Sequence, residues 1–150
     1  MSTIAMAYHV SVLLQQVVQG LQVEAEGSYI DCTVGEGGHA KAILEASSPG
    51  GRLLGIDLDP QALETAEEEL QPFRDSLLLM NDNFNDVRRI AREQGFYPVD
   101  GILFDLGLSS LHLEGEGRGF TFRREEPLDM RFDPRQELTA WEVVNDYSQE

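Results

Sequence analysis

The sequence predicts an α/β fold in which a parallel β-sheet is covered by helices on both faces. Short apolar runs alternate with stretches of helical periodicity between residues 10 and 105. The runs are mostly apolar on both side-chain faces, which is typical of parallel strands buried on both sides. A length of 150 residues is sufficient for one domain with a substantial core.

Four strands are expected, each a short run of apolar and β-branched residues. They cover residues 28–34, 52–57, 76–81 and 99–105. Cys32 lies within the first strand and is expected to be an unreactive core residue. Residues 99–105 are expected to leave an apolar edge exposed unless a further strand pairs with them.

Helices are expected before the first strand and between successive strands. Their ranges are residues 10–21, a stretch that follows Gly38 and includes Ala46, residues 60–70, and a stretch that ends at Gln94. Asp59 is the expected N-cap of the third helix, and Pro60 its first residue. The fourth helix is expected to be capped by Asn85 or Asp86 and stopped by Gly95.

The chain changes character after Asp105. Residues 106–133 lack a clear period and are rich in glycine and arginine, so a long loop or a small insertion is expected. A further helix is expected from Glu137, with Thr139 as its cap. Because only four strands are visible, we expect this chain to be part of a longer protein.

Charge and composition exclude several classes of protein. Asp and Glu number 27 and Lys and Arg 11, giving a net charge of -16. Such a surface repels bare phosphate backbones, so contact with nucleic acid is expected to be local. The single cysteine cannot form an internal disulfide. With no signal-peptide pattern and no apolar run of about 20 residues, we expect a cytoplasmic protein without a membrane partner.

The chemistry is expected at the carboxyl ends of the strands, where open parallel sheets bind ligands. The four loops at residues 31–39, 57–59, 81–84 and 105–110 each contain an acidic residue. Gly35-Glu-Gly-Gly-His-Ala40 fits the pattern G-x-G-x-x-A, and Asp57 follows Gly35 by 22 residues. This arrangement is typical of a nucleoside site, with Asp57 accepting hydrogen bonds from ribose hydroxyls. The alternative is a tight turn and an unrelated surface acid.

The acidic character of these loops bears on the choice of cofactor. The carboxylates concerned are Asp31, Glu36, Asp57, Asp82 and Asp105. They disfavour the pyrophosphate of a dinucleotide and favour the sulfonium and ammonium groups of S-adenosylmethionine. Two alternatives stay open, an NAD-linked oxidoreductase and a non-catalytic nucleoside-binding remnant. We assign no metal ligands.

Six segments occur in order along the chain and carry a family resemblance. They are His9-Val-Ser-Val-Leu-Leu14, Asp31-Cys-Thr-Val-Gly-Glu-Gly-Gly-His39, Gly55-Ile-Asp-Leu-Asp-Pro60, Asp100-Gly-Ile-Leu-Phe-Asp-Leu-Gly-Leu-Ser-Ser110, Arg118-Gly-Phe-Thr-Phe122 and Pro127-Leu-Asp-Met-Arg131. Together they closely resemble the bacterial ribosomal RNA small-subunit methyltransferase H (MraW) family. The resemblance runs from about His9 to the last residue.

The resemblance implies a class I methyltransferase fold, which is Rossmann-like, with a helical insertion after the fourth strand. Residues 1–110 would form the core that binds S-adenosylmethionine, and residues 111–150 would begin the insertion. The implied reaction methylates the N4 amine of a cytidine in small-subunit (16S) ribosomal RNA, near the decoding site. The implied partner is this RNA or the 30S particle. Members of the family are considerably longer than this chain.

The resemblance also implies site residues. Those carried over for the cofactor are Gly37, Gly38 and His39 at its methionine end, Asp57 at the ribose, Phe84 at the adenine, and Asp105 and His112 to complete the site. The chain departs from the family pattern at two places. Leu111 and His112 stand where the family usually has Pro and Gln, and Glu36 stands where Arg is common.

Catalysis on a cytosine amine requires placement against the methyl carbon and an acceptor for a proton. Asp105 is the hypothetical catalytic residue, with Ser109 and Ser110 shaping the target pocket. The alternative is that Asp105 only binds the cofactor. His39 is expected to pack or hydrogen-bond near the cofactor rather than to act as a base.

Residues 118–135 interleave arginines with phenylalanines and acids. Such a segment suits either contact with single-stranded RNA, through phosphate contacts and base stacking, or internal salt bridges. The resemblance favours RNA contact.

Overall fold

The computed structural model describes residues 11–148, and four parallel strands form one sheet in the order β3-β2-β1-β4. The strands are β1 (Ser28–Asp31), β2 (Arg52–Asp57), β3 (Leu77–Asn81) and β4 (Gly101–Leu103). All three neighbouring pairs are parallel. The predicted α/β class with a parallel sheet is confirmed. His9, which opens the first family segment, lies outside the described residues.

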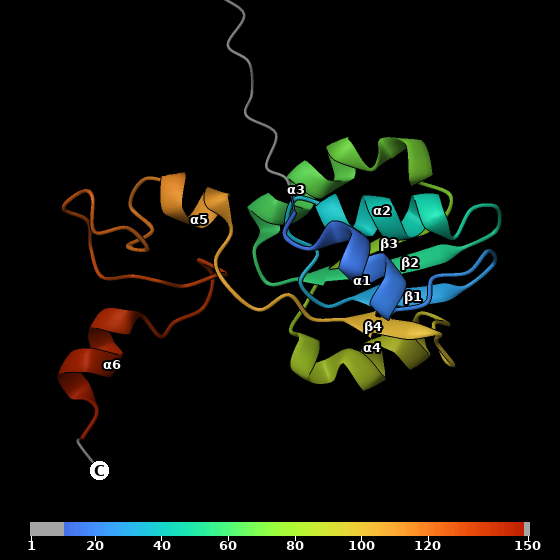
Figure 1. Ribbon diagram of the computed structural model, residues 1–150. Coiled ribbons are helices and arrows are strands. Elements are labelled where there is room, and N and C mark those ends of the chain that lie inside the picture. Colours follow the sequence, from blue (N-terminus) through green and yellow to red (C-terminus); the bar gives the residue numbers. More distant parts are fainter. Residues whose placement is uncertain (1–10, 149–150) are drawn as a thin grey trace, which may run out of the picture.

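Helices cover both faces of the sheet, as Figure 1 shows. The α-helices are α1 (Leu14–Gly20), α2 (Gly38–Ala46), α3 (Pro60–Glu69), α4 (Val87–Glu93), α5 (Ser110–Glu114) and α6 (Ala140–Asp146), and two short 3-10 turns are η1 (Gln71–Phe73) and η2 (Phe84–Asp86). Helices α1, α2 and α3 lie on one face and α4 on the other, whereas α5 and α6 lie off the carboxyl edge of the sheet (Figure 1).

Two apolar clusters form the core, one on each face of the sheet. On the face of α2 and α3, Tyr29, Leu53 and Leu70 are buried together with Ile43. On the face of α4, buried residues of β1 and β2 pack against Ile90 and its neighbours. Because successive side chains of a strand point to opposite faces, apolar residues at both sets of positions bury both sides of the sheet.

The strands β1 and β4 are shorter than predicted. The predicted ranges continued to residues 34 and 105, but the ladders end at Asp31 and Leu103. Beyond that point the backbone N–H of Asp105 donates to the hydroxyl oxygen of Thr33 at 2.8 Å instead of to a strand carbonyl. A side-chain partner thus replaces a backbone one next to β4, whereas on the β2 side the N–H of Val34 still donates to the carbonyl oxygen of Ile56 at 3.1 Å.

Helix ends follow the predicted capping in part. The side chain of Asp59 accepts the N–H of Gln61 at 2.9 Å, so the predicted N-cap of α3 is confirmed. Asp86, one of the two residues predicted to cap the fourth helix, is the N-cap residue of α4, but its side chain makes no capping hydrogen bond. The side chain of Asn83 accepts the N–H of Asn85 at 2.9 Å and starts η2, which leads into α4. An Asx turn at Asn83 thus precedes α4, which begins at Val87.

Several smaller predictions can be checked directly. Helix α1 begins at Leu14 rather than residue 10, because Leu13 has a left-handed φ of 56°. Cys32 is buried, which confirms the predicted core position, and burial raises the pKa of its thiol to about 12. Ile102 and Phe104 are 41% and 47% exposed at the β4 edge, as expected for an apolar edge without a further strand.

Within residues 11–148, no helix combines the length and the apolar character that a membrane span requires.

Candidate cofactor site

The carboxyl ends of the strands carry a row of polar side chains along one edge of the sheet. Asp31, Asp57 and Asn81 are the last residues of β1, β2 and β3, and Asp105 follows β4 by two residues. The connection through α4 crosses to the other face, so the strand order reverses between β1 and β4. In open parallel sheets this reversal point is where ligands bind.

The glycine turn after β1 brings the backbone close to the end of β2. The N–H of Gly35 donates to Oδ2 of Asp57 at 2.8 Å. Gly37 has a φ of +92°, in the region that favours glycine. A Cβ atom on Gly38, the first residue of α2, would lie 1.9 Å from the hydroxyl oxygen of Ser11. The turn is therefore compact, and a side chain is disfavoured at Gly37 and Gly38.

Asp31 is a fully buried carboxylate at the centre of this edge. Its Oδ1 accepts the N–H of Thr33 at 3.1 Å, whereas Oδ2 has no hydrogen-bond partner among the described residues. Burial, with smaller contributions from the nearby carboxylates of Asp57 and Asp105, raises the pKa of this carboxyl to about 6. A buried oxygen without a partner is rare, and it fits a ligand that brings a cation or a hydrogen-bond donor.

Asp57 lies beside Asp31 and is oriented from two directions. Its Oδ2 accepts the N–H of Gly35, and its Oδ1 accepts the N–H of Asp59 at 2.9 Å. Each carboxylate oxygen can accept two hydrogen bonds, so both retain capacity for ribose hydroxyls. The arrangement is compatible with the role predicted for Asp57.

His39 and Asp105 face each other across the glycine turn. Nε2 of His39 lies 2.9 Å from the carbonyl oxygen of Val12, and because a carbonyl only accepts, Nε2 carries the hydrogen. Nδ1 then lies 3.6 Å from Oδ2 of Asp105. His39 is buried whereas the side chain of Asp105 is 56% exposed. Asp105 is therefore the partner that can reach a ligand.

Two phenylalanine rings supply an apolar surface near the same edge. Phe84, in η2 after β3, packs edge to face against Phe104, which follows β4, with ring centroids 5.6 Å apart. Phe84 is half-buried and Phe104 is exposed. An aromatic surface of this kind suits contact with the flat ring of a nucleobase.

His112 contacts protein groups through both ring nitrogens. Nδ1 accepts the N–H of Ser109 at 3.1 Å in a capping box of α5, and Nε2 lies 3.0 Å from Oδ2 of Asp59. Its ring packs against Phe120 and Phe132. His112 thus joins α5 to the start of α3. The side chain of Ser110 lies outside what the structure describes.

Four of the five arginines between residues 118 and 135 form ion pairs. The pairs are Arg118 with Asp59, Arg124 with Glu126, Arg131 with Asp129 and Arg135 with Asp133. The internal salt bridges considered for this segment are therefore present. Arg135 also donates to Asn81 at the end of β3. Arg123 forms no ion pair with any residue that the structure describes, and beside it Phe122 is 99% exposed.

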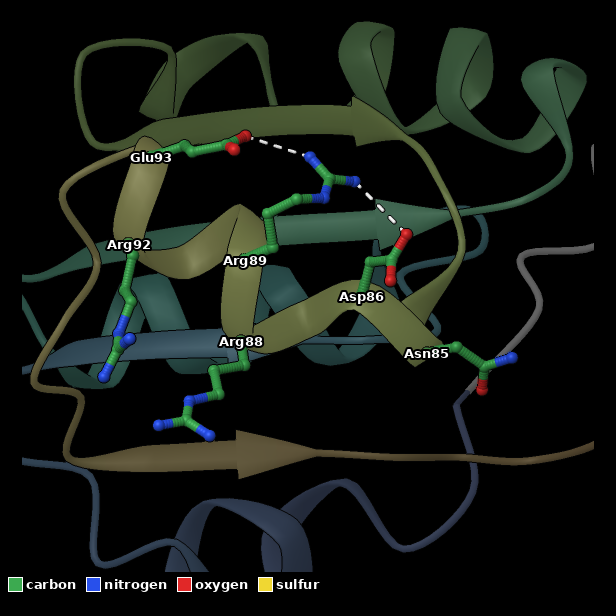
Figure 2. A pocket seen from close by; sticks show the side chains of 6 residues that line it. All are labelled: Asn85, Asp86, Arg88, Arg89, Arg92 and Glu93. Carbon is green, nitrogen blue, oxygen red and sulfur yellow. Dashed lines mark hydrogen bonds and ion pairs between the residues drawn. The ribbon is translucent and has the colours of Figure 1, made fainter.

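A shallow hollow of about 460 Å³ lies on the surface of η2 and α4. In Figure 2, Arg89 reaches between Asp86 and Glu93, while Arg88 and Arg92 point away from it. The hollow includes none of the residues predicted for the cofactor, and its charge is opposite to that of the carboxylate row. It is not the candidate site.

Two residues of the carboxyl edge were missing from the predicted site. Asp31 was noted only for its charge, and its position as the last residue of a buried strand is the signal that could have identified it. Asp59 was assigned only as a helix cap, although it is also buried against His112 and Arg118. The sequence carries no signal for those two contacts, because they join residues more than 50 positions apart.

Comparison with known proteins places the chain in a family. Residues 6–150 match the model of the MraW methylase family. The chain is 53% identical over 139 residues to the ribosomal RNA small subunit methyltransferase H of Dehalococcoides mccartyi, covering 93% of this chain and 40% of that protein. It is 48% identical over 143 residues to the protein of the same name from Thermotoga neapolitana, covering 95% and 47%. The chain thus spans less than half the length of these relatives.

A solved structure confirms the fold. An rRNA methylase from Streptococcus thermophilus superposes with a TM-score of 0.54 at 20% identity, covering 65% of this chain and 57% of that one. At this identity the likeness shows the class I methyltransferase fold and no more. Together with the match over residues 6–150, it leads to one conclusion: this chain belongs to the MraW methylase family.

Proposed function

We propose that this chain is the cofactor-binding part of a methyltransferase that uses S-adenosylmethionine to methylate the N4 amine of a cytidine in small-subunit ribosomal RNA. The observation that carries the proposal is the buried Asp31, with one oxygen unpartnered among the described residues, at the point where the strand order reverses. A carboxylate in that position favours a cationic nucleoside over the pyrophosphate of a dinucleotide. Membership of the MraW methylase family supports the same choice.

The residues around this edge fit the parts of such a cofactor. Gly37, Gly38 and His39 would lie at its methionine end, where the two glycines leave the backbone accessible. Asp57 would hold the ribose hydroxyls, and Phe84 would contact the adenine. Two further residues, Asp105 and His112, complete the set. Because His112 contacts Asp59, we propose that it acts on the cofactor through that residue.

Bound here, S-adenosylmethionine would supply the methyl group and its positive charge. The protein must hold the cytosine amine in line and accept hydrogen bonds from it, because the amine lone pair is delocalised into the ring. The exposed carboxylate of Asp105 can accept a hydrogen bond from that amine. Its backbone is fixed by Thr33 and its side chain faces His39. We therefore propose Asp105 as the catalytic residue, with Ser109 at the rim of the target pocket.

RNA would be contacted locally, by the segment beyond the core. We propose the division into a core of residues 1–110 and an insertion that begins at residue 111. Phe122 and Arg123 are the exposed pair of that insertion that suits base stacking and phosphate contact. The target base must be reached unstacked, by flipping or in an unpaired loop. The RNA alone and the 30S particle are both open as substrates, and the cytoplasm is the proposed location.

The proposal is tested in two steps. Calorimetric titration of the chain with S-adenosylmethionine and, separately, with NAD should show binding of the first alone. Incorporation of radioactive methyl groups into undermethylated small subunits, followed by nucleoside mass spectrometry, should then give N4-methylcytidine. The full-length relative from Dehalococcoides mccartyi serves as the reference. Binding of NAD alone would indicate an oxidoreductase. Cofactor binding without methyl transfer would indicate a non-catalytic remnant.

A further inference from the structure

Asp59 is a buried carboxylate at which three parts of the chain meet. Its Oδ1 caps α3 by accepting the N–H of Gln61 at 2.9 Å. Its Oδ2 lies 3.0 Å from Nε2 of His112 and 3.1 Å from the guanidinium of Arg118. The Asp59 side chain is 1% exposed, so water cannot replace either partner. Asp59 thus joins the core to the segment beyond β4.

The charges at this junction are balanced by Arg118. Burial lowers the pKa of His112 and so favours its neutral form; the positive charge of Arg118 acts in the same direction, and the carboxylate of Asp59 acts against both. Its Nδ1 accepts the N–H of Ser109, which leaves the hydrogen on Nε2; this nitrogen lies 3.0 Å from Oδ2 of Asp59 but forms no hydrogen bond with any described residue. The single cation facing this carboxylate among the described residues is Arg118. Loss of one partner of a buried ion pair leaves an uncompensated charge.

Arg118 also holds the segment that follows it. The same guanidinium donates to the carbonyl oxygens of Arg131 and Phe132 at 3.0 and 2.9 Å, and to the side chain of Gln61 at 3.2 Å. Its planar fork makes these contacts together with the one to Asp59, which a lysine ammonium cannot do. Release of Arg118 would therefore release residues 131 and 132 from the core as well.

The backbone of Asp59 contacts the carboxyl edge of the sheet, where we propose that the cofactor binds. Its backbone N–H donates to Oδ1 of Asp57 at 2.9 Å, and Oδ2 of Asp57 accepts the N–H of Gly35. The carboxylate of Asp57 is thus held between the glycine turn and Asp59. A shift of Asp59 would rotate the group that faces the ribose, although Asp59 itself points away from it.

We propose that Asp59 and Arg118 are positioning residues that couple docking of residues 109–132 to the affinity for the cofactor. The coupling runs from Arg118 through Asp59 to Asp57 and Gly35. It rests on the proposed function, because it requires S-adenosylmethionine at this edge. Neither Asp59 nor Arg118 contacts the cofactor in this arrangement.

The test compares Arg118→Met with Arg74→Met, a matched change at an exposed arginine whose side chain is 75% accessible. Calorimetry should show S-adenosylmethionine binding weakened about three- to thirtyfold by Arg118→Met and unchanged by Arg74→Met. Arg118→Lys should recover part of the loss because it restores the charge. Faster trypsin cleavage at Arg123 in Arg118→Met, with cofactor affinity equal to that of the unaltered chain, would reduce Arg118 to an anchor and overturn the proposal.

A second measurement avoids variants that fail to fold. Coupling between two sites is reciprocal, so cofactor binding must strengthen docking of the segment. Saturating S-adenosylmethionine should slow trypsin cleavage at Arg123 in the unaltered chain. Cleavage at the same rate with a bound cofactor would overturn the coupling and leave the proposed function intact. Absence of cofactor binding by the unaltered chain would instead overturn the proposed function, and this inference with it.

Discussion

Nδ1 of His39 lies 3.6 Å from Oδ2 of Asp105, so a buried ring from α2 faces an exposed carboxylate that follows β4. The contact is longer than a normal hydrogen bond, and it leaves the carboxylate able to bond a ligand. The other ring nitrogen is held by the carbonyl oxygen of Val12. His39 therefore links Val12 to the carboxyl edge of the sheet, and a ring held on one nitrogen by a carbonyl oxygen is not a free base.

Replacing Asp105 by Asn should separate catalysis from cofactor binding. The amide keeps the shape of the side chain but removes the charge and its capacity to take up a proton. We expect methyl transfer to small subunits to fall by about a hundredfold, with a much smaller change in the calorimetric affinity for S-adenosylmethionine. Unimpaired turnover would exclude Asp105 from catalysis. An equal loss of affinity and rate would make it a cofactor-binding acid only.

Replacing Asp31 by Asn should remove a pH dependence of cofactor binding. Burial raises the pKa of Asp31 to about 6, so the carboxyl is neutral below that pH. The affinity for a cationic cofactor should rise by about tenfold per pH unit up to pH 6 and then level off. Calorimetry from pH 5 to 8 should show this slope in the unaltered chain and in Asp75→Asn, an exposed control, but not in Asp31→Asn. A slope that persists in Asp31→Asn would exclude Asp31 as its source.

The titration of Asp31 also changes the stability of the folded chain. This stability falls as the pH rises, whereas the affinity for the cofactor increases. Between pH 3.8 and about 6 the folded chain binds more protons at Asp31 than the unfolded chain does. The contribution of Asp31 to stability is therefore present at low pH and is lost as the pH rises through about 6. Asp31→Asn should lack this loss, so urea titrations should show its stability relative to the unaltered chain rising across that window.

Gly37 should not tolerate a side chain. Its φ of +92° strains any L residue, and a Cβ atom there would lie 3.0 Å from a methyl carbon of Leu70. We expect Gly37→Ala to destabilise the fold by about 1–2 kcal/mol and to weaken S-adenosylmethionine binding. Gly20→Ala is the control, because nothing lies within 4 Å of a Cβ there and its φ is ordinary. Equal melting temperatures for the two variants would contradict the argument.

The sheet and the carboxylate row could be predicted from the sequence because both follow from local patterns. Apolar runs identify buried strands, and the residue at the end of each strand reaches the edge where the carboxyl ends meet. Asp57 was found in this way. The ends of β1 and β4 were not, because the Thr33 hydroxyl competes there with the strand carbonyls.

The junction at Asp59 could not be predicted, because it depends on how a segment without periodicity folds back on the core. Arg131 pairs with Asp129 and Arg135 with Asp133, two positions away in each case, so their pairing is local. Arg118 instead pairs with Asp59 across 59 positions. Several Glu residues lie closer to Arg118 in the sequence than Asp59 does, and only the folded structure determines which acid pairs with it.

His112 should make stability depend on pH in the neutral range. Burial lowers its pKa below the ordinary 6.5, so the unfolded chain binds a proton there before the folded chain does. The contribution of neutral His112 is therefore present above pH 6.5 and is lost as the pH falls through its lowered pKa. Protonation would also remove the acceptor that Nδ1 offers to the N–H of Ser109.

His112→Gln isolates this contribution, because glutamine offers a donor and an acceptor but does not titrate. At pH 8 we expect the variant to be less stable by about 1–2 kcal/mol, the loss of one well-formed buried hydrogen bond. The difference should shrink as the pH falls to 5, while the contribution of Asp31 cancels between the two proteins. Urea unfolding followed by circular dichroism at pH 8, 6.5 and 5 measures this difference in the free energy of unfolding between the two proteins. A gap that stays constant across this range would show that the folded and unfolded chains protonate His112 alike.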